Sequence, residues 1–132
     1  MSNASQSEGL IVLHSDRGVE DLIGRLKQML AARSLRIFAD LDFSADAAAE
    51  GVTLRPTRML IAGNPQAGTP LIEAVPAIAI DLPLKVLVWL DGGGTKVAYN
   101  DPEYLSRRHR LPPELVPNIA GFGALVQKAA GA

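Results

Sequence analysis

Polar side chains gather at positions 63–69, where a strand is expected to give way to a helix. This stretch holds two glycines around Asn64 and ends at Thr69. Free backbone N–H groups at a helix start can bind an anion. The stretch lacks the Gly-Lys-Ser/Thr end of a P-loop and the third glycine of a dinucleotide-binding fingerprint. Two interpretations stay open: a tight turn in which Asn64 and Thr69 cap helices, or a contact with a ligand.

A pair of opposite charges, Asp81 and Lys85, lies between two apolar segments. A charge on an apolar strand needs a partner, because burial of an unpaired charge is costly. We expect the two side chains to pair with each other or with Arg55 or Arg58. Acid–base catalysis by Lys85 and Asp81, with a further carboxylate from Asp42, is the alternative.

Metal and nucleophile chemistry find little support in the sequence. The chain has no cysteine, which excludes disulfides, thiolate nucleophiles and cysteine-ligated metals. The two histidines, His14 and His109, are far apart and have no carboxylate at a ligand spacing. Asp40 and Asp42 share one side of an expected strand, where solvation is the common outcome. We therefore expect no metal and no cofactor, and the sequence names no catalytic residue.

Composition limits the classes of protein to consider. The chain has 132 residues, 48% of them hydrophobic and 20% charged, which is typical of a single globular domain. Its 13 basic and 14 acidic residues give a net charge of -1, which argues against nucleic-acid binding. The polar residues 1–9 do not look like a signal peptide, and we expect them to form a disordered tail before one domain at 10–132. The apolar runs are shorter than the ~20 residues of a membrane span, so we expect no membrane and a cytoplasmic location.

Hydrophobic spacing predicts the elements that must position these residues. Val19, Leu22, Ile23, Leu26 and Leu30 form one stripe of an amphipathic helix. Further helices are expected at 45–50 (capped by Ser44), at 65–75, either continuous or interrupted at 68–70, at 102–108, and at 114–129 as one helix or a bent pair. Strands are expected at 10–13, 35–41 (with alternate residues on one face), 55–62, 77–82, 84–90 and 95–100. Because strands outnumber crossover helices, the pattern favours an α+β fold, with a mainly antiparallel sheet and helices packed on one face.

Four motifs in this order resemble the domain of unknown function 302 family. They are RPTR at 55–58, GNPQAGTPL at 63–71, DLPLK at 81–85 and YNDPEYL at 99–105. With the first helix and NIAG at 118–121, the resemblance covers residues 10–129. It implies a β-α-β4-α fold similar to that of the TATA-binding-protein-like group, and a homodimer. It implies no established activity.

The chain departs from the family pattern at one place. The family often has a histidine soon after its second strand, within Asp-His-Ala, whereas this chain reads Asp42-Phe43-Ser44-Ala45. A ligand or metal role for that histidine in relatives would therefore be in doubt here.

These observations favour a homodimeric binding module for a small ligand, anionic or amphipathic. We expect its pocket between the sheet and residues 65–75, because pockets form at strand–helix junctions. Asn64, Thr69, Lys85 and Tyr99 are the predicted ligand contacts. The alternatives are a small enzyme that uses Lys85 and Asp81, and a protein-interaction or assembly domain without a pocket.

Overall fold

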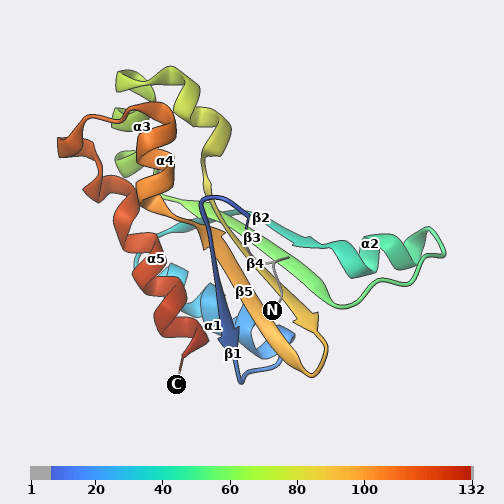
Figure 1. The fold of residues 1–132 in the computed structure, drawn as a ribbon. Helices are drawn as coiled ribbons and strands as arrows, with labels where there is room; N and C mark the ends of the chain where they lie inside the picture. The colour runs from blue at the N-terminus through green and yellow to red at the C-terminus, as the bar shows by residue number, and fades with distance from the viewer. Residues whose placement is uncertain (1–6, 132) are drawn as a thin grey trace.

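The computed structural model describes residues 7–131 and contains one five-stranded antiparallel sheet (Figure 1). Its strand order is β1-β5-β4-β3-β2, which places β1 and β2 at the edges. This arrangement confirms the predicted α+β class and its β-α-β4-α order. The strands are β1 (Leu10–Ser15), β2 (Arg36–Asp42), β3 (Thr57–Gly63), β4 (Leu84–Asp91) and β5 (Gly94–Asn100).

Two long helices, α1 (Val19–Ala32) and α5 (Pro117–Ala130), cover one face of the sheet (Figure 1). The predicted stripe of α1 is buried and packs on β2, β3 and β4, while α5 packs on β1, β4 and β5. At Gly123, α5 comes so close to the sheet that a Cβ would lie 2.8 Å from the Tyr99 ring. A larger residue at position 123 would push the helix off the sheet, which explains the glycine.

The opposite face of the sheet carries a continuous apolar row. The strand register places Val12, Ala98, Leu87, Met59 and Leu41 side by side across all five strands. Four of these side chains are partly exposed, and Ala98 is buried between its larger neighbours. The face that α1 and α5 leave open therefore carries an apolar row, with charged residues such as Lys85 and Lys96 beside it.

A β-bulge divides β2 into two halves. Alternate residues at 35–41 were expected on one face, but the register shifts between Ile37 and Ala39. Ile37 pairs with Ala62 on the helix-covered face, whereas Ala39 lies on the opposite face. One extra residue reverses the alternation of every side chain after it. The bulge therefore turns Asp40 toward α1.

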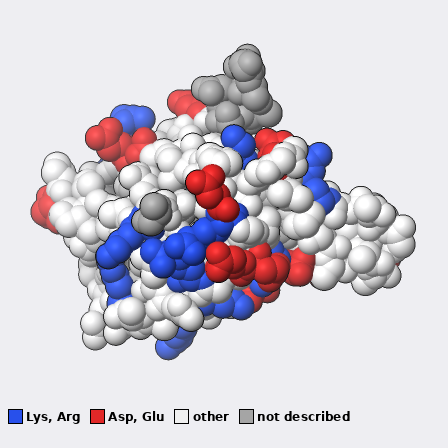
Figure 2. Space-filling model, turned by 90° about the horizontal axis from the view of Figure 1, so that it is seen from below, with Lys and Arg blue, Asp and Glu red and all other residues white. Residues whose placement is uncertain are grey.

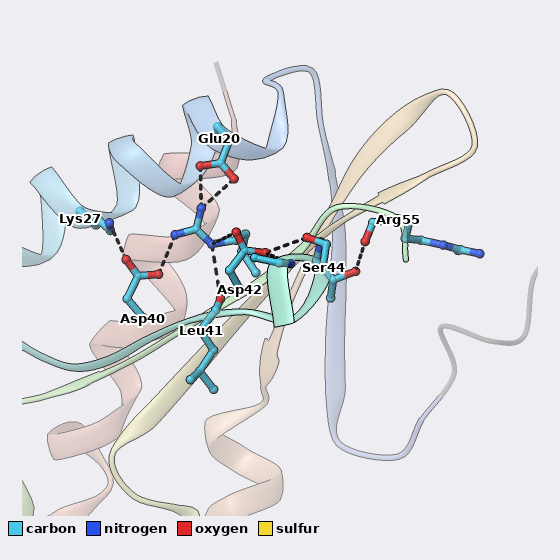
Figure 3. A network of polar contacts seen from close by, with 10 residues as sticks. Glu20, Lys27, Asp40, Leu41, Asp42, Ser44 and Arg55 are labelled. Carbon is cyan, nitrogen blue, oxygen red and sulfur yellow. Dashed lines mark hydrogen bonds and ion pairs between the residues drawn. The ribbon is translucent and has the colours of Figure 1, made fainter. Parts of the chain in front are cut away.

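The Asp40 side chain, which the bulge turns inward (Figure 3), binds Arg58. Arg58 is only 9% exposed. One terminal nitrogen of Arg58 donates to both carboxylate oxygens of Glu20, at 2.6 and 2.7 Å, and the other donates to Asp40 at 2.7 Å. Its Nε donates to the backbone oxygen of Leu41 at 3.3 Å. Lys27 Nζ lies 2.6 Å from the second oxygen of Asp40. This Arg58 network joins α1, β2 and β3.

The Arg58 network fixes the ionisation of its members. Burial alone would raise the pKa of Asp40, but hydrogen bonds from Lys27 and Arg58 and their positive charges outweigh it and hold that pKa below its usual value. Hydrogen bonds to Glu20 and Asp40 raise the pKa of Arg58. Asp40 and Arg58 therefore both stay charged at neutral pH.

A short helix, α2 (Phe43–Ala49), follows β2 directly and projects beyond the sheet (Figure 1). Asp42, and not Ser44 as expected, caps it by accepting from Ala45 N–H at 3.0 Å. The Ser44 hydroxyl donates to the same carboxylate at 2.7 Å. Asp42 takes the cap because the helix begins at Phe43, two residues before the predicted start. These hydrogen bonds, the one from Ala45 foremost, lower the pKa of Asp42.

The expected strand at 77–82 is wrong: this stretch lies in a 3₁₀ helix, η2 (Pro76–Asp81). In it Ile78 is buried while Ile80 is 72% exposed. Short apolar runs fit a strand and a helix equally well by periodicity. Pro76 and Pro83 flank the run, and neither has the N–H that a central strand needs.

Three further elements build a second layer at one end of the sheet: α3 (Pro65–Ala74), α4 (Pro102–His109) and η3 (Pro113–Leu115). Together with η2 and the start of α5 they enclose a second apolar cluster, made of Leu71, Ile78, Leu105, Leu111 and Ile119. Residues 1–6 of the expected tail lie outside the described residues. Gly9 is tied to this layer, because its backbone oxygen accepts from Asp101 N–H at 2.8 Å.

The Arg58 network predicts an acid-dependent part of the stability. Because the pKa of Asp40 is lower in the folded chain than in the unfolded chain, its stabilisation is complete above about pH 4 and is lost as pH falls through the folded-state value. We expect Asp40→Asn to lower the free energy of unfolding by about 1 kcal/mol at pH 7, after allowance for solvent screening. Urea unfolding measured from pH 7 to pH 3 should show the difference from the wild type shrinking in acid.

Asp91→Asn is the matched control, since Asp91 lies exposed at the β4–β5 turn and forms no ion pair within residues 7–131. It should leave the pH profile unchanged. A difference between Asp40→Asn and the wild type that stays constant down to pH 3 would contradict the assignment.

Candidate functional site

A cavity of about 530 Å³ opens between α3, α5 and the ends of β2, β3 and β4. Its floor is formed by buried apolar side chains, namely Leu71, Ile119, Phe122 and Leu125. The volume falls within the ~300–1,000 Å³ that small-molecule sites usually occupy. We call this space the α3–α5 cavity.

Local sequence fixes the two helical walls of the α3–α5 cavity. Helix α3 begins at Pro65, in the first helical position, where the missing N–H of proline costs nothing. The Asn64 side chain caps it by accepting from Gln66 N–H at 2.9 Å. The Asn118 amide then donates to the backbone oxygen of Ala67 at 2.9 Å and ties α5 to α3. Both helices start at the cavity, so their partly positive ends face it.

The rim of the α3–α5 cavity is more polar and more exposed than its floor. It includes Arg33, Thr69, Phe38 at 45% exposure and Ile72 at 40% exposure. Within residues 7–131, the Arg33 side chain has no hydrogen bond or ion pair, and no Asp or Glu lines the cavity. Arg36 lies outside the lining and stacks over the Phe38 ring, 5.3 Å from its centroid. The cavity is therefore apolar inside, with a cation at its edge.

The structure brings together two of the four predicted ligand contacts. Asn64 and Thr69 both line the α3–α5 cavity. Tyr99 is buried on the helix-covered face, where its hydroxyl accepts from the Gln127 amide at 2.7 Å. Lys85 precedes Val86, the cross-strand partner of Tyr99, and so points to the opposite face. Neither Lys85 nor Tyr99 lines the cavity.

The expected partners of Asp81 are replaced by others. Asp81 binds Arg108 at 2.8 Å and His109 Nε2 at 2.6 Å, and these contacts tie η2 to α4. Within the described part of the chain no ion pair joins Asp81 to Lys85 or to Arg58, whose guanidinium is occupied by the Arg58 network. The carboxylate and the amine proposed for acid–base chemistry are thus not in contact.

Sequence reasoning missed several residues of the cavity. Arg33 directly follows the first helix, where a basic residue suits the helix dipole, and that position gives no hint of a pocket. Phe38 reaches the rim because it sits at the bulge in β2, which alternation does not show. Asn118 was noted only within a family-like motif. The one available signal was the strand–helix junction at 63–69.

Other kinds of site find no support in the part of the chain that the structure describes. Residues 7–131 contain no group of three His, Cys, Asp or Glu residues placed to hold a metal. Their helices are too short or too polar to cross a bilayer. Figure 2 shows basic side chains gathered directly beside acidic ones on one face of the molecule, so charges of both signs meet there.

Comparison with known proteins finds relatives that are longer than this chain. It is 34% identical over 128 residues to proteins of Brucella suis biovar 1 and Brucella melitensis biotype 1, named fluoride-specific ion channels FluC 1 and FluC 2. The match covers 93% of this chain but only 50% and 47% of those proteins. The chain thus spans about half the length of the curated relatives it matches.

A solved structure shares the fold at low sequence identity. The crystal structure of an uncharacterized conserved DUF302 protein from Bacillus stearothermophilus aligns with a TM-score of 0.78, 18% identity, and coverage of 94% of this chain and 97% of that one. A family model matches residues 11–126, nearly the whole domain. The order of strands and helices, the four motifs and this match together show that the chain belongs to the family described as domain of unknown function DUF302.

Proposed function

We propose that this protein is a cytoplasmic, homodimeric binding module that holds a small, mainly apolar ligand in the α3–α5 cavity. One observation carries the proposal: a cavity of about 530 Å³ with a buried apolar floor lies at the strand–helix junction that the sequence singled out. Apolar surface left open to water is costly unless something covers it, and a ligand that covers it gains that free energy.

The polar groups of the cavity fit a role in orienting the ligand. The side-chain oxygen of Asn64 caps α3. Its NH₂ group can therefore donate a hydrogen bond to a ligand. The Thr69 hydroxyl can donate or accept. A few directed polar groups around an apolar floor are typical of small-molecule sites. In this proposal Asn64 and Thr69 contact the ligand, and Lys85 and Tyr99 have no part in this cavity.

Lining glycines offer a way to close the cavity without disturbing the core. Gly68 and Gly121 line it, and a Cβ added at either would meet no atom within 4 Å. We expect Gly121→Trp, and separately Gly68→Trp, to weaken binding of the neutral fluorophore N-phenylnaphthylamine about tenfold or more, because the indole occupies the ligand's space. Fluorescence titration measures the affinity.

Gly24→Trp is the matched control for these variants. Gly24 lies in α1 outside the cavity, and a Cβ there also meets no atom within 4 Å. This variant should bind the fluorophore like the wild type. A wild-type protein that does not bind the fluorophore, or cavity variants that bind it unchanged, would refute the proposed function.

The homodimer that the family resemblance implies has a candidate surface in the apolar row. Val12, Ala98, Leu87, Met59 and Leu41 cross the sheet on the face that α1 and α5 leave open. Contiguous exposed apolar patches commonly mark interaction surfaces. Two copies related by a two-fold axis would each cover the row of the other.

We expect Leu87→Glu to convert the dimer to a monomer, because dimerisation would then bury two like charges against an apolar surface. Native mass spectrometry at micromolar concentration measures the oligomeric state. Ile80→Glu is the control, since Ile80 is 72% exposed on η2, away from the apolar row. A monomeric wild type, or a dimer that survives Leu87→Glu, would rule out this interface.

A second candidate function is that of a domain that supports an ion channel. It is favoured by the curated relatives, which are named fluoride-specific ion channels and are twice as long as the aligned segment. Deleting the aligned half of the Brucella suis protein should lower its fluoride transport into vesicles, and replacing that half with this chain should restore it. Transport that is unaffected by the deletion, or that the replacement fails to restore, would contradict this function.

A further inference from the structure

We propose that the ligand of the α3–α5 cavity is an amphipathic acid, with an apolar tail on the cavity floor and an anionic head at Arg33. This inference rests on the proposed function and adds to it the chemical class and the orientation of the ligand. Three features of the cavity support it: the polarity gradient from floor to rim, the sign of the charge at the rim, and the way the chain holds Arg33.

The polarity gradient sets the direction in which a ligand enters. The floor residues Leu71, Ile119 and Leu125 are at most 2% exposed and offer only hydrocarbon. A charged group placed among them would lose its hydration and gain no partner, which is strongly unfavourable. Phe38 and Ile72 extend the apolar surface outward to the rim. The apolar part of a ligand therefore goes in first, and its polar part stays at the mouth.

The charge at the mouth is positive. Arg33 is the one charged residue that lines the cavity within residues 7–131, and no carboxylate there would offset it. A cationic ligand would meet repulsion and a neutral one would gain nothing from Arg33. An anionic head can form two parallel hydrogen bonds with the planar guanidinium, a geometry that suits carboxylates and phosphates.

The chain holds the base of Arg33 and leaves its end free. Arg33 directly follows α1, and its backbone N–H donates to the backbone oxygen of Leu30 at 3.1 Å. Leu30 is fully buried in the main core, so this position is fixed relative to the sheet. The guanidinium has no partner of its own within the described chain, so no existing contact must be broken when an acid binds. Arg36, by contrast, is engaged with the Phe38 ring.

The test compares two probes that differ only in the head group, decanoate and decanol, each used below its aggregation limit. Isothermal titration calorimetry of the wild-type protein should show decanoate binding about fivefold tighter than decanol, the ratio expected for one solvent-accessible ion pair. Salt should weaken binding of decanoate and leave binding of decanol unchanged, because only the former involves charge. Decyl phosphate in a third titration distinguishes a general anion site from one that prefers carboxylates, and tighter binding of either anion than of decanol supports the inference.

Arg33→Gln keeps a polar side chain at the rim and removes the charge. It should bind decanoate and decanol with equal affinity, whereas the control variant Arg36→Gln should keep the wild-type preference. Circular dichroism checks that both variants fold. The salt dependence of decanoate binding by the wild type tests the role of charge without any variant.

The outcomes separate this inference from the proposed function. Equal affinity of the wild type for decanol and for both anions, or a preference for an anion over decanol that survives in Arg33→Gln, would overturn the amphipathic acid and leave an apolar binding site. Absence of binding by both probes would overturn the proposed function, and this inference with it.

Discussion

The Arg58 guanidinium is the contact on which the placement of β2 depends. It is nearly buried on β3, and it binds Glu20 of α1 and Asp40 of β2 at once. An edge strand with a bulge is otherwise free to slip, since a shift of one residue exchanges its two faces. Slippage of β2 would remove Asp40 from Arg58 and leave a nearly buried charge without one of its partners. The network stabilises register more than it adds to total stability, because Glu20 stays 71% exposed and such pairs are weak.

The same register determines one wall of the α3–α5 cavity. The segment that runs from the end of α1 into β2 supplies Arg33, Leu35 and Phe38 to the lining. Lys27 and Glu20 anchor the preceding helix, and Asp40 anchors the strand just beyond the bulge. Phe38 lies at the bulge itself, so the irregularity that turns Asp40 inward also leaves the aromatic ring at the rim. The Arg58 network thus anchors the helix and the strand that carry this apolar wall.

The cavity persists because the residues around it have little side chain to fill it. Gly63, Gly68, Gly121, Ala67 and Ala79 all line it. The cavity lies between two separate apolar clusters. The main cluster lies between α1, α5 and the sheet, and the second one lies beneath α3, η2 and α4. Pro83 leaves little room for a side chain at Gly63, because a Cβ there would lie 3.3 Å from the Cβ of Pro83. Close packing elsewhere in the core contrasts with this open space.

Strong periodic patterns in the sequence predicted the elements that carry most of the fold, and failed where one residue decides the geometry. The stripe of α1 needs many residues to agree, so its periodicity alone identifies the helix. The short apolar run of β3 marks a buried strand. A bulge at Phe38 leaves no periodic pattern in the sequence. It turns Asp40 into the Arg58 network and leaves Phe38 at the rim of the cavity. Asn64 could be placed at a pocket because caps mark helix starts. Thr69 was expected to cap a second helix, but α3 runs through it without a break. Lys85 and Tyr99 could not be excluded from it, because alternation in β4 and β5 becomes informative only once the register that pairs Val86 with Tyr99 is known. The sheet therefore separates what the sequence grouped: Tyr99 lies on its covered face, Lys85 on its open face, and Asn64 and Thr69 at the cavity beside its end.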